Sequence, residues 1–506
     1  MSDDSVHAAL RSDAPLVVVE APAGCGKTSK GADYAREIAV ADATNRLLIL
    51  THTHAACSVF ADRTRGAGSR VEIRTIDSVI AHIASVYHIG LGLPADVAAW
   101  VRQRQDGYAE LALSVAAFLL RYPMIVASLA QRHRVVICDE HQDSSGEQHS
   151  IVMALQTHGA RLRIFGDPMQ KIFRERARVS TCVPCDWEEL TRQAHAFEQL
   201  DFPHRWTGGC PQLGQWTLAA RTALKAGGRV DLRNGLPPSV TVVFAENQSR
   251  RNLEYQLSSQ ERRQIDAFER ANNSLLILTR YNDTARSFRG FFNRRIPLWE
   301  GHTRDGLEKL VNALSAGEGN SLALAAAIVA FMGDVGKGFS PSAFGNRFEK
   351  EVREGCTGNC RGKPALIQEL ARFLVAEPNH SGVAKMLRRV SQLVHTDRDF
   401  ADVKIDCGGE FREAICLGDF ATAESGLTEI THRRIYSRPR PPDKTISIIH
   451  KAKGLECDSV IIMPCDAKTF PDKQDARCLL YVALSRAKQR LMLVVSRNSP
   501  SPLLTI

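Results

Sequence analysis

The stretch Ala21–Thr28, APAGCGKT, constrains the fold more than any other part of the chain. It directly follows an apolar run, LVVVEAP at 16–22, and precedes a stretch with a helical pattern, SKGADYAREIAV. A glycine-rich loop between a buried strand and a helix lets backbone N–H groups and the helix dipole hold phosphates. The loop therefore predicts an α/β domain that binds a nucleotide. The general pattern begins with Gly where this chain has Ala21, so a glycine turn with a surface lysine is the simpler alternative.

The candidate nucleotide ligands in this loop are Ala23, Gly24, Cys25, Gly26, Lys27 and Thr28. Lys27 would neutralise the β- and γ-phosphates of ATP, and the Thr28 hydroxyl would ligate Mg²⁺. A site of this kind needs a second strand that ends in an acid. VVICDE at 135–140 meets this need, with Asp139 as the magnesium acid and Glu140 as the general base that polarises the attacking water. A strand that ends in a solvated turn is the alternative.

Short apolar runs recur along the chain, and each is followed by a polar or glycine turn and a helical stretch. Continuous apolar runs fit strands buried on both faces of a parallel sheet. Their alternation with helices predicts two α/β domains with parallel sheets. The runs lie at 16–22, 46–53, 134–140, 162–168, 240–247, 274–282, 446–453, 459–466 and 490–496.

The domain division follows from these runs and from composition. A Gly/Pro-rich patch, KAGGRVDLRNGLPPS, lies between the two sets of strands and is typical of a linker. The later stretches LALAAAIVAFM and VAKMLRRVSQLV have the pattern of amphipathic or buried helices and interrupt the second domain. The predicted division is a first domain at 1–224 with a small helical insert at about 81–130, a linker at 225–239, a second domain at 240–300 and 439–506, and an inserted helical subdomain at 301–438.

Composition narrows the class of protein. The 506 residues exceed one ordinary core, and 44% hydrophobic with 24% charged residues is typical of a globular chain. The net charge of +9 permits nucleic-acid binding without requiring it. The acidic segment 1–16 has no apolar region for a signal peptide, and no apolar run approaches the ~20 residues that span a bilayer. We therefore expect a cytoplasmic protein without a membrane partner.

The 13 cysteines are odd in number and scattered, which is typical of reduced thiols. Cys138, Cys416 and Cys465 fall inside predicted strands. Two pairs, CVPC at 182–185 and CTGNC at 356–360, have spacings that also allow a four-thiolate zinc or iron–sulfur site. Free thiols are the simpler interpretation for both pairs.

One motif carries a specific family resemblance. DEHQDSSGEQ at 139–148 resembles the Asp-Glu-aromatic-Gln-Asp signature of the UvrD/Rep/PcrA helicases of superfamily 1. Further stretches resemble motifs of that family in the same order, and the ordered set is far more specific than any one of them. They are THTHAAC (51–57), RTIDSV (74–79), GDPMQKIF (166–173), FPHRW (202–206), HKAKGLEC (450–457) and YVALSRAKQRL (481–491).

The resemblance implies two RecA-like P-loop domains, with ATP and Mg²⁺ between them and single-stranded DNA across their top. Gln170 would then sense the γ-phosphate, and Arg205 would contact it from the first domain. Arg486 would reach it from the second domain as an arginine finger that works only when the cleft closes. Glu456 would bind the ribose, and Gly454 would let the backbone approach the nucleotide.

The departures from the family pattern lie mostly where DNA would bind. Glu175 stands where the family has an aromatic that stacks on a base, and Ala55 replaces the lysine of the single-strand motif. THRRIYSRPRPPDK at 431–444 is a basic stretch that would replace these contacts, or else a solvated loop. On the nucleotide side, His204 replaces the tyrosine that stacks on adenine, and the segment 1–20 has no glutamine to read the base.

These features predict an ATP-dependent DNA helicase or translocase on single-stranded DNA, with 3′-to-5′ polarity. The compact layout resembles the helicase-like subunit of the Gabija anti-phage defence system. That likeness implies a role in phage defence or DNA processing, with a nuclease partner or self-assembly through the subdomain at 301–438. The alternative is a nucleotide-gated subunit that senses DNA ends and regulates a nuclease with little processive unwinding. An RNA helicase is a third interpretation.

Overall fold

The computed structural model describes residues 2–41, 46–102, 104, 106–173, 182, 184–248, 255–301, 304–437 and 440–506. Its fold is mixed α/β, with parallel sheets and helical insertions, as the sequence predicts. By its internal contacts the chain divides into two compact units. Unit 1 holds Met1–Asn247, Leu257–Leu275 and Lys453–Ile506, and unit 2 holds Gln248–Gln256 and Leu276–Ala452. The domain bounds drawn from the sequence remain predictions.

The first sheet, in unit 1, has six strands in the order β3-β2-β4-β5-β1-β6. All of its neighbouring strands are parallel. The carboxyl ends of the strands therefore meet at one edge, and the loops after β1, β4 and β5 lie close together there. The strands are β1 (Leu16–Glu20), β2 (Leu47–Thr51), β3 (Val71–Thr75), β4 (Val135–Cys138), β5 (Arg161–Gly166) and β6 (Ala196–Gln199).

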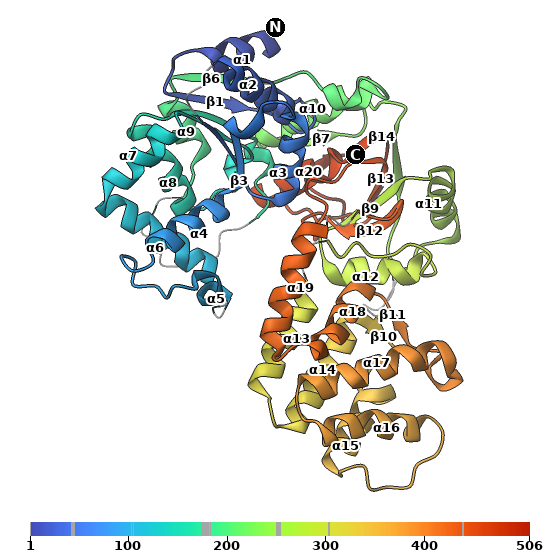
Figure 1. Ribbon diagram of the computed structural model, residues 1–506. Helices are drawn as coiled ribbons and strands as arrows, with labels where there is room; N and C mark the ends of the chain where they lie inside the picture. The colour runs from blue at the N-terminus through green and yellow to red at the C-terminus, as the bar shows by residue number, and fades with distance from the viewer. Residues whose placement is uncertain are drawn as a thin grey trace. The chain divides into compact units, whose positions relative to one another are not determined.

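Helices cover both faces of this sheet, because successive residues of a strand point to opposite sides. Leu16 and Val18 of β1 belong to one core with the helices after β3 and β4, whereas Val17 and Val19 belong to a second core with the first helices of the chain. Figure 1 shows the two layers. The first layer contains α4 (Ile76–Val86), α5 (Val97–Arg102), α6 (Gly107–Arg121), α7 (Pro123–Arg132), α8 (Gly146–Thr157) and α9 (Trp187–Gln193), and the second contains α1 (Ser2–Arg11), α2 (Lys27–Ala41) and α3 (His54–Arg63).

The second sheet has five strands in the order β12-β9-β13-β14-β8. Within unit 1, β14 pairs in parallel with both β13 and β8. A short pair, β7 with β15, places part of the predicted linker in a strand. The remaining elements of this region are β7 (Val230–Asp231), β8 (Val240–Phe244), β9 (Leu275–Thr279), β12 (Lys444–Ile448), β13 (Cys457–Cys465), β14 (Ala487–Val495), β15 (Leu504–Thr505), α10 (Pro211–Lys225), α11 (Ser259–Ala271) and α20 (Gln474–Leu484).

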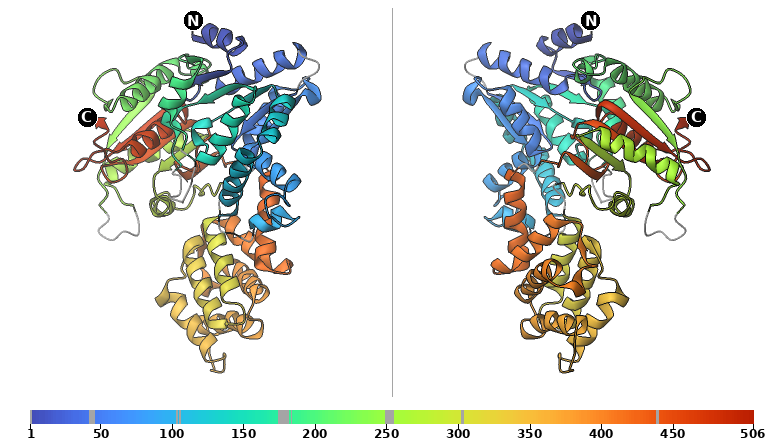
Figure 2. Two further views of the ribbon diagram at one scale, coloured as in Figure 1. Left: turned by 90° about the vertical axis from the view of Figure 1, so that its left-hand side faces the viewer. Right: turned by 90° about the vertical axis from the view of Figure 1, so that its right-hand side faces the viewer.

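Unit 2 contains a helical bundle with a core of its own. Ile328, Phe348, Leu370 and Met386 come from four different helices and are fully buried in it. Figure 2 shows these helices, yellow to orange, packed together. The elements are α12 (Asn282–Phe291), α13 (Asp305–Ala316), α14 (Ser321–Val335), α15 (Asn346–Arg353), α16 (Lys363–Ala376), α17 (His380–Thr396), α18 (Gly408–Cys416), α19 (Ala423–Ser437), β10 (Gly336–Lys337) and β11 (Lys404–Ile405).

The apolar pattern of α14 is explained by this core. Leu324, Ile328 and Phe331 are buried in it, and within the described part of 301–438 only Leu322 and Val375 are large exposed hydrophobic residues. The helix therefore contributes little apolar surface. The strand predicted around Cys416 is wrong, because this residue ends α18 and the local apolar residues face the helical core.

Among the described residues, no single helix is long and apolar enough to cross a membrane. Only α6 and α7 together pass such a test, across a bend of 98°. Their apolar residues, including Leu111, Val115 and Val126, are buried against the six-stranded sheet.

Candidate nucleotide-binding site

The loop between β1 and α2 has the backbone conformation that phosphate binding requires. Gly24 and Gly26 have φ angles of +77° and +85°, which residues with a side chain rarely adopt. A Cβ atom on Gly24 would lie 2.6 Å from the ring of Trp206. The Arg205 N–H donates to the Gly24 carbonyl at 3.0 Å, so the loop packs directly against FPHRW. Lys27 then begins α2, and Thr28 lies in its first turn.

Lys27 lies against both acids that follow β4. Its Nζ is 3.4 Å from Asp139 Oδ1 and forms a closer ion pair with Glu140. Burial lowers the pKa of Lys27, but the two carboxylates raise it more, so the ammonium stays charged. Apart from this ion pair with Lys27, Asp139 Oδ1 is buried without a hydrogen-bond partner among the described atoms, which fits an oxygen that ligates a metal.

The two acids have opposite electrostatic environments. Burial raises the pKa of Asp139, and the Lys27 charge offsets this only in part. Burial also raises the pKa of Glu140, but Lys27 and Lys453 outweigh it and hold the pKa well below the ordinary glutamate range. Glu140 therefore remains an ionised acceptor through mildly acidic pH, as a general base must.

Glu140 has an unusual backbone conformation, with φ 55° and ψ 36°. A side-chain-bearing residue in this left-handed region costs about 1–2 kcal/mol, and such strain concentrates at functional sites. The Gln142 amide donates to the Glu140 carboxylate and accepts the Asp167 N–H at 3.0 Å. Gln142 thus links the loop after β4 to the loop after β5 and fixes the direction of the Glu140 carboxylate.

Gln170 is positioned by Asp167, which is fully buried. The Gln170 amide donates to Asp167 Oδ2 at 3.0 Å, and Lys453 Nζ donates to the Gln170 carbonyl at 2.8 Å. Lys453 also forms an ion pair with Asp143. Residues from the stretches DEHQD, GDPMQ and HKAKGLE therefore meet at one point, and Lys453, which the sequence analysis did not single out, joins them.

Arg205 contacts a second predicted site residue. One of its guanidinium nitrogens donates to Glu456 and another donates to the Ser485 carbonyl at 2.6 Å. The structure therefore places the predicted ribose-binding acid beside an arginine that is predicted to contact phosphate. Gly454, two residues earlier, has φ +83°, and a Cβ atom on it would meet no atom within 4 Å.

Arg486 is 2% exposed and makes only neutral contacts. Its guanidinium donates to the carbonyls of Val482 and Leu455 and to the Ser485 hydroxyl at 2.7–3.2 Å. In the described part of the chain no carboxylate forms an ion pair with it. Burial lowers its pKa to about 10, which leaves it charged at neutral pH. A buried guanidinium without an anionic partner is suited to a phosphate.

Further contacts around the loop were not predictable from motif spacing. The Ala23 N–H donates to the buried Tyr481 hydroxyl at 2.8 Å. The buried Cys25 thiol has its pKa raised to about 12, so it stays protonated and acts as a small apolar residue. His204 lies over Gly26 and contacts Asp3 of α1 at 3.0 Å. An acid from the N-terminal segment therefore lies near this loop, whereas the family has a glutamine upstream of the loop to read the base.

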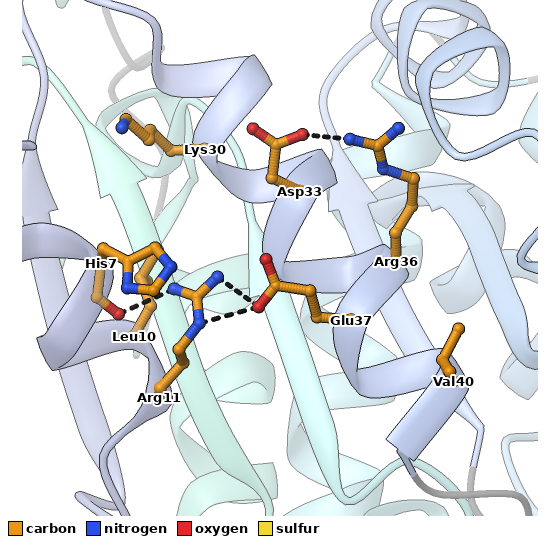
Figure 3. Close-up of a pocket in the computed structure, with 8 residues that line it drawn as sticks. All are labelled: His7, Leu10, Arg11, Lys30, Asp33, Arg36, Glu37 and Val40. Carbon is orange, nitrogen blue, oxygen red and sulfur yellow. Dashed lines mark hydrogen bonds and ion pairs between the residues drawn. The ribbon is translucent and has the colours of Figure 1, made fainter.

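A pocket of about 680 Å³ lies between α1 and α2. Most of its charged groups are already paired, since Arg11 reaches Glu37 and Arg36 reaches Asp33 (Figure 3). We assign it no role in nucleotide binding. Its lining residues are His7, Leu10, Arg11, Lys30, Asp33, Arg36, Glu37 and Val40.

On the predicted DNA side, Ala55 is exposed in the first turn of α3. Phe173 is 52% exposed, and Lys453 Nζ lies 5.3 Å from its ring centre. Glu175 lies outside the described residues. In the basic stretch at 431–444, Arg433 and Arg434 form ion pairs with glutamates of unit 2, so these two charges are partly committed within the fold.

These features define a P-loop nucleotide-binding protein. A phosphate loop follows the first strand of a parallel sheet, an acid pair follows a second strand, and a glutamine follows a third. Comparison with known families agrees. Residues 5–176 match an AAA domain, and residues 367–498 match the UvrD-like helicase C-terminal domain. No curated protein matches the sequence. The two domain matches support a UvrD/Rep-like DNA helicase of superfamily 1, which is an ATP-dependent hydrolase.

A buried network of ion pairs supports the residues of this site, and it leads to a prediction about stability. Arg221 of α10 donates to both Asp167 and Glu20 at 2.7 Å, and all three are buried. We expect Arg221→Met to lower the free energy of unfolding by about 3–5 kcal/mol, because two buried carboxylates lose the guanidinium that they share. Urea denaturation at neutral pH measures this loss.

The matched control is Arg36→Met on α2, whose exposed ion pair with Asp33 should contribute less than about 1 kcal/mol. The effect also depends on pH. Burial raises the pKa of Glu20, but Lys225 and Arg221 lower it by more, so the net pKa lies below the ordinary glutamate value. The stabilisation is fully present above the ordinary glutamate pKa and is lost as the pH falls through the lowered pKa. Equal losses in the two variants would contradict the network.

Proposed function

We propose that this chain is an ATP-dependent translocase or helicase that moves 3′ to 5′ on single-stranded DNA. The observation that supports it best is the meeting of Asp143, Gln170 and Lys453 beside the phosphate loop. These residues come from three stretches that are far apart in the sequence. Such a network connects the residues expected to hydrolyse ATP with residues that are distant in the sequence. A motor needs a connection of this kind, because hydrolysis must be converted into movement.

In this proposal Thr28 and Asp139 would hold Mg²⁺, and the loop N–H groups of Gly24, Gly26 and Lys27 hold the phosphates. The bound ion neutralises phosphate charge and helps to orient the phosphates. Lys27 exchanges its ion pairs with Asp139 and Glu140 for the phosphates. Glu140 then holds the attacking water and accepts its proton, while Gln170 orients the same water.

The two arginines act on the charge that develops during transfer. Arg205 exchanges its contact with Glu456 for the γ-phosphate, which frees Glu456 to bind the ribose. Arg486 exchanges its backbone contacts for the same phosphate and acts as the arginine finger. Because Lys453 contacts both Asp143 and the Gln170 carbonyl, movement at the phosphate is transmitted to the HKAKGLE stretch and its neighbour Phe173.

A second candidate is a nucleotide-gated subunit that senses DNA ends and switches a partner nuclease, in the manner suggested by the likeness to the Gabija helicase-like subunit. The exposed Ala55 favours it, because the missing lysine removes a phosphate contact that a processive motor uses. A role in phage defence and a partner surface on 301–438 belong to this proposal. Since most large apolar residues of α14 are buried in the core of unit 2, such a surface would be mainly polar.

One experiment separates these functions. ATP turnover is measured with no nucleic acid and with single-stranded DNA, single-stranded RNA and duplex DNA, and unwinding is measured on duplexes with 3′ or 5′ tails. The motor predicts stimulation by single-stranded DNA and unwinding from 3′ tails. The regulatory subunit predicts stimulation by ends without unwinding. Stimulation by RNA alone, or no stimulation by any nucleic acid, contradicts both.

Phe173 provides a test of strand binding. It is about half exposed beside Lys453, and we infer that its ring stacks on a base when a strand binds. We expect Phe173→Ala to weaken single-strand affinity about tenfold, because a base–aromatic stack contributes ~1–3 kcal/mol. Fluorescence anisotropy at several salt concentrations measures both this loss and the phosphate contribution, and we expect the wild-type affinity to fall steeply with salt.

The control is Phe202→Ala, since Phe202 is 49% exposed but packs against His204 on the nucleotide side. It should leave strand affinity unchanged. Equal affinity of the Phe173 variant and the wild type would remove this residue from the DNA site.

A further inference from the structure

Three side chains with metal-binding atoms converge beside the catalytic loop. His141 follows Glu140 directly, His149 lies on α8, and Cys185 precedes α9. One ligand atom from each lies within 4.8 Å of the other two, and His141 Nε2 is 3.0 Å from His149 Nδ1. Ligand atoms around a tetrahedral zinc ion are separated by roughly 3.3–3.8 Å, given its bond lengths to nitrogen and sulfur. The cluster therefore needs only a small adjustment to surround one ion.

The surroundings of His141 are those of a metal ligand. Its other ring nitrogen, Nδ1, lies 3.1 Å from the Ser144 hydroxyl, and that hydroxyl lies 3.2 Å from His52 Nε2. A metal-bound histidine is almost always held by such a contact on its second nitrogen, which sets the tautomer and the ring orientation. His141 is 1% exposed, so its ring cannot turn away into solvent.

The residues that follow Cys185 are held in place by hydrogen bonds. Asp186 caps α9 by accepting the N–H groups of Glu188 and Glu189, and Trp187 donates to the buried Glu20 at 3.0 Å. Cys185 itself is 6% exposed. Cys182, three residues earlier, lies outside this cluster in the structure but packs against the same core, and the C-x-x-C spacing is that of many zinc sites.

The donor set selects the metal. Imidazole nitrogen with thiolate sulfur favours Zn²⁺ over the oxygen-seeking Mg²⁺ and Ca²⁺. None of the 13 cysteines forms a disulfide.

We propose that His141, His149 and Cys185 bind one Zn²⁺ ion, with Cys182 as the fourth ligand. The ion joins the loop that carries Glu140 to α8 and to the chain segment before α9. All four coordination positions are filled by protein, so the site is structural rather than catalytic. It braces the loop that carries the general base and goes beyond the proposed motor function, since it needs neither ATP nor DNA.

Metal analysis of the purified full-length protein tests the proposal. We expect one zinc per chain, and we expect metal-free protein to bind one Zn²⁺ or one Co²⁺, the latter with thiolate-to-cobalt absorption. Cys185→Ser and His149→Ala should lose the stoichiometric zinc, and Cys185→Ser should also lose much of that absorption. Ser144→Ala should weaken zinc binding about 10–100-fold, as removal of a supporting contact does. Cys182→Ser should weaken it as well.

Three controls make the outcome specific. Cys416→Ser and His395→Ala change exposed residues of unit 2 and should keep the zinc. Asp139→Asn should also keep it, whereas loss in this variant would place the ion in the nucleotide site and overturn the proposal. Absence of zinc from the wild type together with no binding of Zn²⁺ by metal-free protein would also overturn it. Unchanged affinity of Cys182→Ser would remove the fourth ligand and with it the closed site.

Discussion

Arg486→Ala is expected to reduce the maximal rate of ATP hydrolysis by about 10³-fold or more, which is the effect of removing an arginine finger. The residue is buried, charged at neutral pH, and bound only to carbonyls and a hydroxyl. These neutral contacts are weaker than contacts with an anion, so exchange for a phosphate is favourable. ATP affinity should change far less than the rate, because the finger acts on charge that develops in the transition state.

The measurement is steady-state ATP turnover with saturating single-stranded DNA, together with ATP binding by equilibrium titration. Arg486→Lys should recover little, because a point charge cannot make the paired contacts of a guanidinium. Arg490→Ala is the matched control, since Arg490 is exposed on β14, the strand that begins directly after Arg486. A normal rate in Arg486→Ala would show that its contacts with Val482 and Leu455 are purely structural.

The sequence predicted the central strands well because they are apolar on both faces. β1, β2 and β9 are buried at every position, and each lies within a predicted run. The strands that the sequence missed, β3 (VEIRT) and β6 (AFEQ), lie at the two edges of the six-stranded sheet. Edge strands have partly exposed residues, so they lack the continuous apolar run by which a buried strand is recognised.

The site shows a similar division. Local spacing was enough to bring Lys27, Asp139 and Glu140 together, because each follows a strand of one parallel sheet. Contacts between distant residues have no local signature. Arg221 reaches Glu20 across 201 positions, and Lys453 reaches Asp143 across 310. For Lys453 its place within HKAKGLEC offered a signal, but the partner required the fold.

Apolar periodicity also could not distinguish a core from an interface. The pattern in α14 suggested a docking surface for a partner, yet the same residues fill the core of unit 2. A helix that is apolar on most sides reads the same way in either setting. Likewise, sequence spacing suggested only CTGNC as a partner of the CVPC pair in a metal site, because the approach of His141 and His149 to Cys185 depends on the fold.

The most informative single substitution is Glu140→Gln, which should lower turnover by about 10²–10⁴-fold while ATP binding is kept. The amide is close in size but cannot accept a proton from the attacking water. It also removes one of the two carboxylates that hold Lys27 away from the phosphates. ATP must displace Lys27 from Asp139 and Glu140 in the wild type, so the variant should bind ATP at least as tightly as the wild type does.

Opposite effects on binding and turnover identify a base, because a residue with a merely structural role would weaken both. Glu188→Gln, the same chemical change at an exposed position of α9, is the control and should alter neither quantity. Burial raises the pKa of Glu140, but Lys27 and Lys453 outweigh it and hold the pKa below the ordinary range, so wild-type turnover should not fall through loss of this charge between pH 7 and about pH 5. Unchanged turnover in Glu140→Gln would move the base to another residue, and the buried Asp139 beside it, whose pKa is raised, would be the first to test.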